Sequence, residues 1–519
     1  MKTGLRLAAL AGVLLLFGSC TRLVRIPAED WGAVTPDVRV RVTLVDGEQF
    51  QLSRPWFGTE ALHGFVRRQV PLDGEPERVG AARRPTFSTD SVAVPLDSID
   101  AIEVNDASWG APVLVGLAAV GATIAIIAAN GEDRRRPAAE PRPSTPFPSC
   151  PFLYSWDGSA WTLDSETFSG AVTRGLQRSD LDNLEHLRAV EGVYRLRLAN
   201  ERPETQYTDA VGVVVVDHPT GTEVFPDARG AYHGLQRASA PLRAHGLRGA
   251  DVRAAVEERD GIWWEGDDLA SVEGADPGEL RDGMILTFDH PAAERGLLAV
   301  HAINTPLAPF ALRQFLDAQG DDLVSWYRKV DRDPDERARV RRWIHREAML
   351  LVSIWKDGMW ELQDALMDVG PNLPKTQVAT LDLRGVTGSE VRVRIESARG
   401  LWAVDEVRLG RETDAGLEVR ELSPRRATGR DGRDVTAEIA SSDSRYHMAT
   451  RGDVVHLEFA APDPPPTGTS RTVLARTSGF YHLHTDHWGR TAHPDVADRM
   501  LDEPGYAARY VLERLRHVP

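Results

Sequence analysis

Apolar and polar residues alternate along much of the chain with the period of two that is typical of β-strands. Near the beginning this alternation covers residues 38–52 and is interrupted at Asp46-Gly47, a dipeptide that strongly favours a hairpin. A second run, residues 92–104, predicts another strand pair around a turn. We therefore predict a small β domain over residues 21–109, shaped like a compact barrel of about five strands.

Strand-like runs rich in β-branched and aromatic residues also fill most of the chain after residue 150. They occur at residues 192–201, 209–219, 283–291, 296–304, 391–410, 453–462 and 471–484. Between them, residues 306–348 have a helical pattern and predict two or three helices. Asp333-Pro334 marks one helix start, because proline fits the first helical position.

One stretch of the β region is repeated. Residues 240–264 match residues 423–447 at a constant offset of 183 residues, without a gap. The first copy shares these residues with the second: Pro241, Arg243, Ala244, Gly246, Gly249, Asp251, Val252, Ala254 and Asp260. Polar positions change, since His245 becomes Thr428 and Arg259 becomes Ser442. Turn residues persist while polar residues vary, so we interpret the repeat as scaffold and not as a duplicated active site.

The similarity continues beyond the repeat. Residues 286–291 resemble 457–462, and "RGLLA" at 295–299 resembles "RTVLA" at 471–475. We predict a mainly β protein with two related β-sandwich-like modules, residues 150–305 and 349–519, separated by the helical insertion.

Residues 111–129 form an uncharged apolar segment, close to the ~20 residues that span a bilayer as a helix. Arg134, Arg135 and Arg136 follow it, whereas residues 91–110 contain acidic residues and no Lys or Arg. This asymmetry favours a transmembrane helix with residues 131–519 in the cytoplasm. The alternative is a buried apolar segment, which leaves the whole chain on the exported side. Residues 130–149 are Pro-rich and predict an extended linker.

The first twenty residues have the pattern of a secretory signal, with Lys2 and Arg6 before an apolar core and small residues before Cys20. Residues 1–20 resemble a bacterial lipoprotein signal peptide, although Phe17 occupies the position where leucine is usual. The resemblance implies lipid attachment, including palmitate, at Cys20. Several acyl chains would anchor the protein stably in a membrane. The alternative is an ordinary signal peptide with a coincidental cysteine.

Composition narrows the function further. The chain is 42% hydrophobic and 27% charged, as in a folded protein, and its net charge of −16 argues against general binding of nucleic acid. Only Cys20 and Cys150 are cysteines, so lipidation of Cys20 excludes an intramolecular disulfide. Cys150 has no basic neighbour to activate it as a nucleophile.

Residues 149–219 contain Ser-Cys-Pro, then an aromatic residue, Trp-Asp-Gly and a later "TQYTD" segment. This stretch resembles a module of bacterial envelope lipoproteins to which no function is assigned, and a similar stretch occurs in proteins with the ASPIC/UnbV domain. The resemblance implies a multidomain envelope protein. It implies no catalytic residue.

Three groups of residues are candidates for chemistry. His482, His484, Asp486 and His487 are close in sequence, and alternate residues of a strand face the same side, as a metal-chelating pair requires. The simpler interpretation is a solvated strand end. Residues 331–336 resemble the start of an EF-hand loop, but Arg342 stands where its bidentate glutamate belongs. They fit a helix start better.

The third group is Trp402 with Asp405, in a stretch that resembles the closing strands of galactose-binding-like jelly rolls. An exposed Trp402 would stack on a sugar and Asp405 would bind hydroxyl groups. A buried Trp402 in a sandwich core is the commoner arrangement. No phosphate-binding loop, dinucleotide fingerprint or Gly-x-Ser-x-Gly motif is present.

The sequence therefore predicts a non-catalytic, membrane-anchored lipoprotein of the bacterial cell envelope, without cofactor or metal. Its β modules would bind envelope proteins or glycans, or take part in assembly. The first alternative is a carbohydrate-recognising or carbohydrate-processing envelope protein. The second is a metal-dependent enzyme that uses His482, His484 and His487.

Overall fold

The computed structural model describes the following residues: 23–26, 40–45, 49–57, 61–69, 87–105, 151–266, 277–485 and 490–515. They belong to two compact units, residues 1–117 and 118–519. The described chain is mainly β, as predicted. The predicted signal peptide with Cys20, the apolar segment 111–129, the predicted linker 130–149 and Cys150 lie outside the described residues.

The first unit is a six-stranded sheet with the order β1-β6-β2-β3-β4-β5. Its strands are β1 (Leu23–Ile26), β2 (Val40–Leu44), β3 (Gln49–Phe57), β4 (Ala61–Gln69), β5 (Phe87–Pro95) and β6 (Ile99–Asn105). β2 and β3 pair antiparallel on either side of Asp46-Gly47, as the hairpin signal predicts. The strands around residues 96–98 do not pair with each other, contrary to our prediction. A 3-10 turn (Leu96–Ser98) follows Pro95 there, and β6 joins β1 and β2 while β5 pairs with β4.

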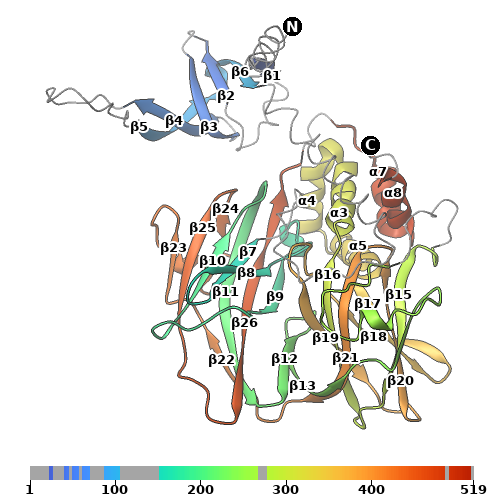
Figure 1. Ribbon diagram of the computed structural model, residues 1–519. Coiled ribbons are helices and arrows are strands. Elements are labelled where there is room, and N and C mark those ends of the chain that lie inside the picture. Colours follow the sequence, from blue (N-terminus) through green and yellow to red (C-terminus); the bar gives the residue numbers. More distant parts are fainter. Residues whose placement is uncertain are drawn as a thin grey trace, which may run out of the picture. The chain divides into compact units, whose positions relative to one another are not determined.

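The second unit contains two pairs of five-stranded sheets, shown in Figure 1. In what we call the outer sheet pair, one sheet has the order β23-β25-β10-β7-β8 and the other has the order β22-β11-β26-β9, with β24 paired to β11. Its strands come from both ends of the unit. They are β7 (Phe152–Trp156), β8 (Trp161–Glu166), β9 (Arg178–Asn183), β10 (Val193–Ala199), β11 (Glu204–Pro219), β22 (Glu418–Leu422), β23 (Arg426–Gly429), β24 (His447–Ala449), β25 (Val454–Ala460) and β26 (Thr469–Leu483).

The inner sheet pair is built from the part of the chain between β11 and β22. Its sheets have the orders β12-β13-β21-β16-β19 and β14-β15-β20-β17-β18. The strands are β12 (Thr222–Pro226), β13 (Tyr232–Ser239), β14 (Arg243–Gly246), β15 (Arg281–Asp289), β16 (Arg295–Asn304), β17 (Leu350–Lys356), β18 (Met359–Leu366), β19 (Lys375–Asp382), β20 (Glu390–Ala398) and β21 (Trp402–Thr413). In each pair the two sheets share one hydrophobic core, built from alternate residues of their strands.

The two sheet pairs have the same strand order when β7–β11 are matched with β17–β21. The remaining matches are β22 with β13, β23 with β14, β25 with β15 and β26 with β16. This differs from the predicted modules 150–305 and 349–519, each of which contains strands of both pairs. The reason is that β11 pairs along its length with β26 and not with β16, which pairs with β19 and β21 instead.

The match extends to single residues and to bulges. Leu153↔Ser165 is followed by Tyr154↔Leu163, and Val352↔Asp364 by Ser353↔Leu362, so one residue of the partner strand is extra in both pairs. Asp209 of β11 and Asp405 of β21 are likewise the extra residues where the register shifts. Ala302 and Gly479 therefore occupy equivalent positions, because they pair with Val404 and Thr208 just before each bulge.

This register corrects the predicted match of residues 295–299 with 471–475. Leu298 contributes to the core of the inner sheet pair, whereas Leu474 lies on the opposite face of its sheet. The residue types of the two segments agree, but the structural match is shifted by one residue, and such a shift moves each side chain to the other face of the sheet.

The repeated stretch forms the same backbone hydrogen bonds in both copies. The amide of Val252 donates to the carbonyl of Ala244 at 3.0 Å, and that of Val435 donates to Ala427 at 2.9 Å. Gly249 and Gly432 close equivalent turns with φ of 90° and 82°. The 3-10 turn Arg253–Ala255 in one copy corresponds to the short helix α6 (Thr436–Ile439) in the other. The conserved positions of the repeat thus make its turns and its strand.

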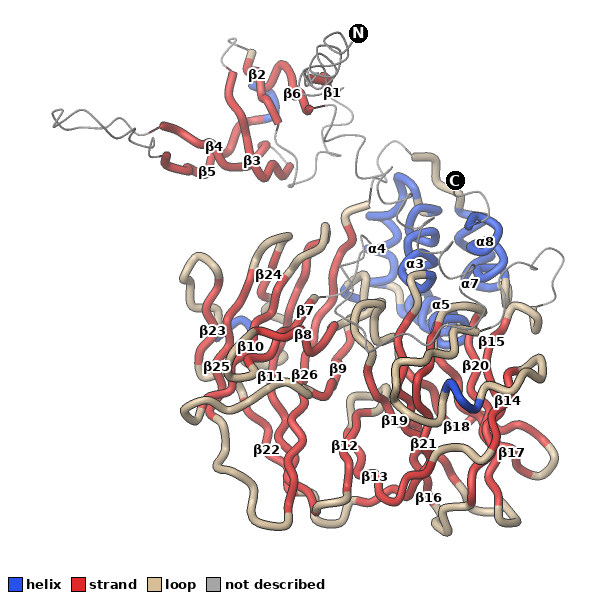
Figure 2. The backbone as a smooth tube through the Cα atoms, in the orientation of Figure 1, coloured by secondary structure: helices blue, strands red, loops and turns tan. Residues whose placement is uncertain are grey.

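Helices follow strand β16 and strand β26. After β16 come α3 (Leu307–Ala318), the 3-10 turn Gly320–Asp322, α4 (Leu323–Arg332), α5 (Pro334–Trp343) and the π-helical turn Ile344–Ala348, within the predicted insertion. After β26 come α7 (Pro494–Asp502) and α8 (Tyr506–Leu515), which we did not predict. Figure 2 shows these helices gathered together, and α3 contacts both α7 and α8. Among the helices that the structure describes, none has the length and apolar composition needed to cross a membrane.

Candidate functional site

The histidine group does not form a metal site within the described chain. His482 is largely buried and stacks on Tyr327, with ring centroids 4.8 Å apart, and burial lowers its pKa. His484 instead has its Nε2 2.9 Å from the Thr205 hydroxyl. Asp486 and His487 lie outside the described residues. Among the residues that the structure describes, no three His, Cys, Asp or Glu side chains are placed to hold a metal ion.

Trp402 and Asp405 have structural roles. Trp402 is 2% exposed, and its indole N–H donates to the carbonyl of Ala348 at 2.8 Å. Its ring is therefore not available to a sugar. Asp405 accepts a hydrogen bond from the amide of Gly261 at 3.1 Å, and burial raises its pKa to about 6.

Residues 331–336 begin a helix, as predicted. The Asp333 carboxylate accepts from the amides of Asp335 and Glu336 at 2.9 and 3.4 Å, which caps α5. Asp331 accepts from the Thr173 hydroxyl and the Gly175 amide, each at 2.7 Å, which ties the 3-10 turn Arg174–Leu176 to α4. The carboxylates of Asp331 and Asp333 thus accept from backbone amides and a hydroxyl group, in a helix cap and a turn contact and not in a calcium loop.

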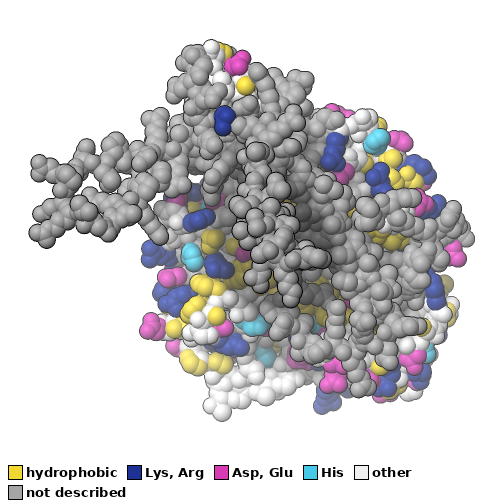
Figure 3. All heavy atoms as spheres, turned by 45° about the horizontal axis from the view of Figure 1, so that its top comes forward, with side chains coloured by type: hydrophobic (Ala, Val, Ile, Leu, Met, Phe, Trp, Pro, Cys, Tyr) yellow, Lys and Arg dark blue, Asp and Glu magenta, His cyan; other side chains and the backbone are white. Residues whose placement is uncertain are grey.

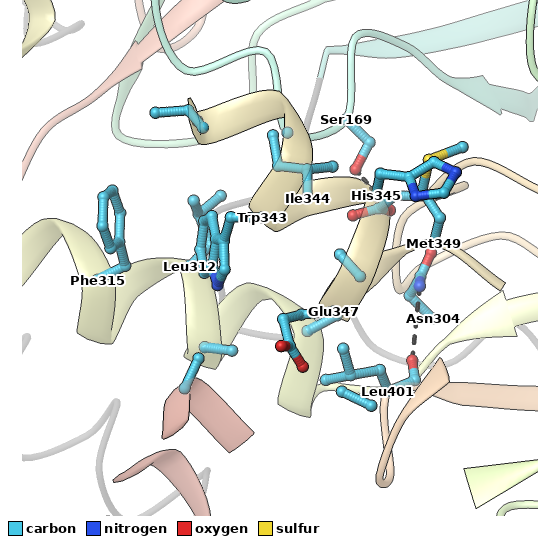
Figure 4. Close-up of a pocket in the computed structure, with 18 of the residues that line it drawn as sticks. Ser169, Asn304, Leu312, Phe315, Trp343, Ile344, His345, Glu347, Met349 and Leu401 are labelled. Atoms are coloured by element: carbon cyan, nitrogen blue, oxygen red, sulfur yellow. Dashed lines mark hydrogen bonds between the residues drawn. The ribbon is translucent and has the colours of Figure 1, made fainter. Parts of the chain in front are cut away.

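An apolar cavity of about 440 Å³ lies between the helices and the sheets. We did not predict it. Most of its wall is hydrophobic: Val172, Leu176, Leu307, Ala308, Ala311, Leu312, Phe315, Trp326, Val340, Trp343, Ile344, Ala348, Met349, Met367, Ala398, Leu401, Ala507, Ala508, Val511 and Leu512. Figure 4 shows helical Leu312, Phe315 and Trp343 on one side, and Asn304, Met349 and Leu401 on another. Its volume is in the ~300–1,000 Å³ range of small-molecule sites.

Aromatic packing holds the helical wall of the cavity in place. The ring of Phe315 in α3 lies 5.1 Å from that of Trp326 in α4 and 4.8 Å from that of Trp343 in α5. All three side chains are buried. Three helices therefore meet around one ring, and these contacts hold the helices together beside the cavity.

The sheet side of the cavity is fixed by buried polar contacts. The Asn304 side chain accepts from the amides of Val369 and Gly370 at 2.8 and 3.1 Å and donates to the carbonyl of Leu401 at 3.5 Å. Ser169 donates to the Asp368 carboxylate at 2.6 Å. The Glu347 carboxylate accepts from the Gly505 amide at 3.1 Å. Because these groups bond to protein, they give the cavity an ordered wall with few polar groups to offer.

A second concavity, a groove of about 480 Å³, runs along α5 and the π-helical turn. Its described lining consists of Pro334, Arg337, Ala338, Arg341, Arg342 and His345. These positions recur at intervals of three and four residues, so they share one face of the helix. Arg341 and His345 also line the apolar cavity, and both are exposed. The two concavities are therefore neighbours, one apolar and one basic.

No protein-family model matches the chain, and a search of curated proteins finds no match either. The site must be interpreted from its own geometry.

Sequence reasoning missed this site because its walls are distant in the chain. The described lining runs from Ser169 to Leu512 and includes parts of four helices and several loops. One signal was present: Phe315, Trp326 and Trp343 are large aromatic residues within a short, highly charged helical region. So many aromatic residues there indicate a helical wall packed against something apolar.

Proposed function

We propose that this protein is a non-catalytic lipoprotein of the bacterial cell envelope that presents two β-sandwich-like modules and binds an apolar ligand in the cavity beside its helices. Cys20 would carry the lipid anchor, and residues 111–129 would add a transmembrane helix if they span the bilayer. The anchor would place the protein in the inner membrane in that case, and in either membrane otherwise. Envelope proteins or glycans remain proposed partners of the modules.

The cavity is the observation that supports ligand binding. Its lining is mainly hydrophobic, and its buried polar groups Asn304, Ser169 and Glu347 are engaged by other parts of the protein. A wall of this kind offers apolar contact over a large area but no set of acids, bases or nucleophiles for catalysis. Binding of an apolar molecule is the function that this chemistry supports best.

A neutral fluorescent probe tests the proposal directly. Purified protein should bind N-phenyl-1-naphthylamine with enhanced, blue-shifted emission. The variant Ala311→Phe should abolish that binding because it fills the cavity, whereas Ala250→Phe, at an exposed turn, should not. Circular dichroism checks that both variants are folded. Binding that survives in Ala311→Phe, or no saturable binding by the wild type, would contradict the proposal.

The membrane anchor requires its own test. Cys20→Ala should move the protein from the membrane fraction to the soluble fraction and abolish incorporation of labelled palmitate. If residues 111–129 span the membrane, the variant should lose the label but stay in the membrane fraction. A membrane-impermeant maleimide directed at Cys150 would then report which side residues 131–519 occupy.

The sugar-binding alternative is less well supported. Trp402 is buried, and four of the partly exposed tryptophans form close cross-strand pairs, Trp156 with Trp161 and Trp355 with Trp360. The guanidinium group of Arg392 lies 5.0 Å and 5.5 Å from the ring centroids of the second pair. An arginine thus already lies beside the aromatic rings of this pair, where a sugar would stack.

A further inference from the structure

We propose that the ligand is an anionic amphiphile whose single apolar chain enters the cavity and whose carboxylate or phosphate lies in the basic groove. This inference rests on the proposed binding function and names the class of ligand. The shared edge of the two concavities supports it. Arg341 and His345 line both, so a molecule that fills the apolar cavity and emerges at this edge meets cationic and hydrogen-bonding side chains first.

The charge of the groove differs from that of the chain. The chain carries a net charge of −16, and on the face in Figure 3 acidic and basic side chains are interspersed over the described surface. The described lining of the groove contains three arginines and no acidic residue. A local cluster of positive charge focuses the electrostatic field and attracts anions.

Three nearby acidic residues form ion pairs with cations outside the groove lining. Glu336 lies 2.8 Å from Lys329 and 3.7 Å from Arg339. Arg339 also forms ion pairs with Asp498, at 2.9 Å, and with Asp502. Glu336, Asp498 and Asp502 thus pair with Arg339, which is not part of the groove lining, although Asp502 also interacts electrostatically with Arg342.

The groove arginines have little else to bind. Arg337 donates to the carbonyls of Val330 and Asp331, and Arg341 donates to that of Gly175 at 3.3 Å. Arg342 and His345 form no hydrogen bond or ion pair with other residues in the described part of the chain. Arg341, Arg342 and His345 therefore retain donors for an anion, and arginine donors match a carboxylate or phosphate particularly well.

The test compares two ligands that differ only in the headgroup. Palmitate and hexadecanol have the same apolar chain, and each is titrated against protein loaded with N-phenyl-1-naphthylamine. We expect palmitate to displace the probe at least about tenfold more effectively than hexadecanol. Arg341→Gln combined with Arg342→Gln should weaken palmitate about tenfold and leave hexadecanol unchanged. Arg237→Gln, an exposed arginine outside the groove, is the matched control.

Each outcome has a separate meaning. Equal displacement by palmitate and hexadecanol, unaffected by the double variant, would overturn the headgroup assignment while the apolar site stands. Failure of both ligands and of the probe to bind would instead overturn the proposed function. Lysophosphatidylglycerol, titrated in parallel, separates the two sources of such an anion. Its preference over palmitate indicates a membrane lipid, and the reverse order indicates a free fatty acid.

Discussion

The outer and inner sheet pairs have the same strand order and bulges but differ in the side chains at some equivalent positions. Their strand orders, registers and two bulges correspond, and an aspartate supplies the extra residue of one bulge in each, Asp209 and Asp405. The other bulge contains Asp164 in the outer pair and Gln363 in the inner pair. Both side chains there accept bonds from backbone amides, from Glu185 and His186 in one case and from Asp382 in the other. Both sheet pairs therefore have, at this bulge, a side-chain oxygen that accepts hydrogen bonds from backbone amides.

The order of the strands along the chain explains why the pairs are interleaved. Strands β7–β11 and β17–β21 form one type of half, and β13–β16 and β22–β26 form the other. The halves alternate along the chain, yet the first half pairs with the last and the two middle halves pair with each other. Helices follow β16 and β26, and the two helical groups pack together. The cavity forms beside this shared helical region, which the duplicated strands alone do not build.

The largest expected difference between the pairs depends on pH. Glu204 in β11 is fully buried, whereas the inner pair has Gly400, just before β21, at the same distance along the chain from the bulge. The Glu204 Oε1 accepts from Gln206 at 2.8 Å, and its Oε2 has no partner among the described residues. Burial raises the Glu204 pKa from its ordinary value of 4.5 to about 8. The folded state thus favours the protonated form, and stability should fall as the pH rises from 4.5 to 8.

Glu204→Gln should remove this loss. We expect equal stability of variant and wild type below pH 4.5, and a variant more stable by about 3–4 kcal/mol at pH 8. Urea unfolding across this pH range measures the difference. Glu361→Gln, on an exposed strand of the inner pair, serves as the control and should not alter the slope. If the wild type and Glu204→Gln have parallel pH profiles, Glu204 ionises freely in the folded protein.

The next largest effect on stability is expected when the equivalent residues Gly479 and Ala302 are each replaced by the other's residue type. A Cβ on Gly479 would lie 2.5 Å from the carbonyl oxygen of Tyr207 and 2.8 Å from the ring of Phe168. The inner pair has Ala302 at this position. Gly479→Ala should therefore cost about 3 kcal/mol in the free energy of unfolding. Ala302→Gly should cost only about 1 kcal/mol, through added backbone entropy. Similar costs for the two variants would show that the positions tolerate a side chain equally.

Alternation and the repeat predict a large part of this fold. They identify the strands β10, β11, β15, β16, β20, β21, β25 and β26, the helical insertion with the start of α5 at Asp333, and the structural character of residues 240–264. They do not identify strand partners, because alternation states which face a residue occupies and not which strand lies beside it. Leu298 and Leu474 illustrate this point, since matching letters belong to opposite faces.

Two other features, the C-terminal helices and the cavity, were not predicted, and the reasons differ. The helices α7 and α8 have a local signal that we overlooked: Ala497, Met500 and Leu501, and likewise Ala508, Val511 and Leu512, follow the i, i+3, i+4 spacing of a helix face and are buried. The cavity has no local signal of this kind, because its lining comes from segments that meet only in the folded chain. The basic groove has a partial sequence signal, because Arg337, Arg341 and His345 form an i, i+4 series that is visible in the sequence.

The two bulge aspartates should respond in opposite directions to the same substitution. Asp209 accepts from the amides of Asp443 and Ser444 at 3.2 and 2.7 Å, from Gln177 at 3.0 Å and from the Ser442 hydroxyl. Asp209→Asn places an amide group against donors and should cost about 2 kcal/mol.

Asp405 has fewer donors, and its pKa is raised from 3.8 to about 6 by burial. The stability that it contributes in its protonated form is lost as the pH rises through this range. Asp405→Asn should consequently stabilise the protein by about 1 kcal/mol at pH 7.5 and have no effect below pH 4. Thermal unfolding of both variants at the two pH values checks the signs. Equal destabilisation by both substitutions at pH 7.5 would contradict this difference.

The smallest effect tests the equivalence of the repeated turns. The amides of Gly249 and Gly432 donate to the carbonyls of Gly246 and Gly429 at 2.8 and 2.9 Å, and both residues have positive φ. A Cβ at either position meets no atom within 4 Å, so an alanine there is penalised only by its backbone conformation. Gly249→Ala and Gly432→Ala should each cost about 1 kcal/mol. Gly278→Ala, with equal space but no positive φ, should be neutral or slightly stabilising. Costs that differ by more than about 1 kcal/mol between the two repeated positions would show that the turns respond to their surroundings and not to their shared backbone.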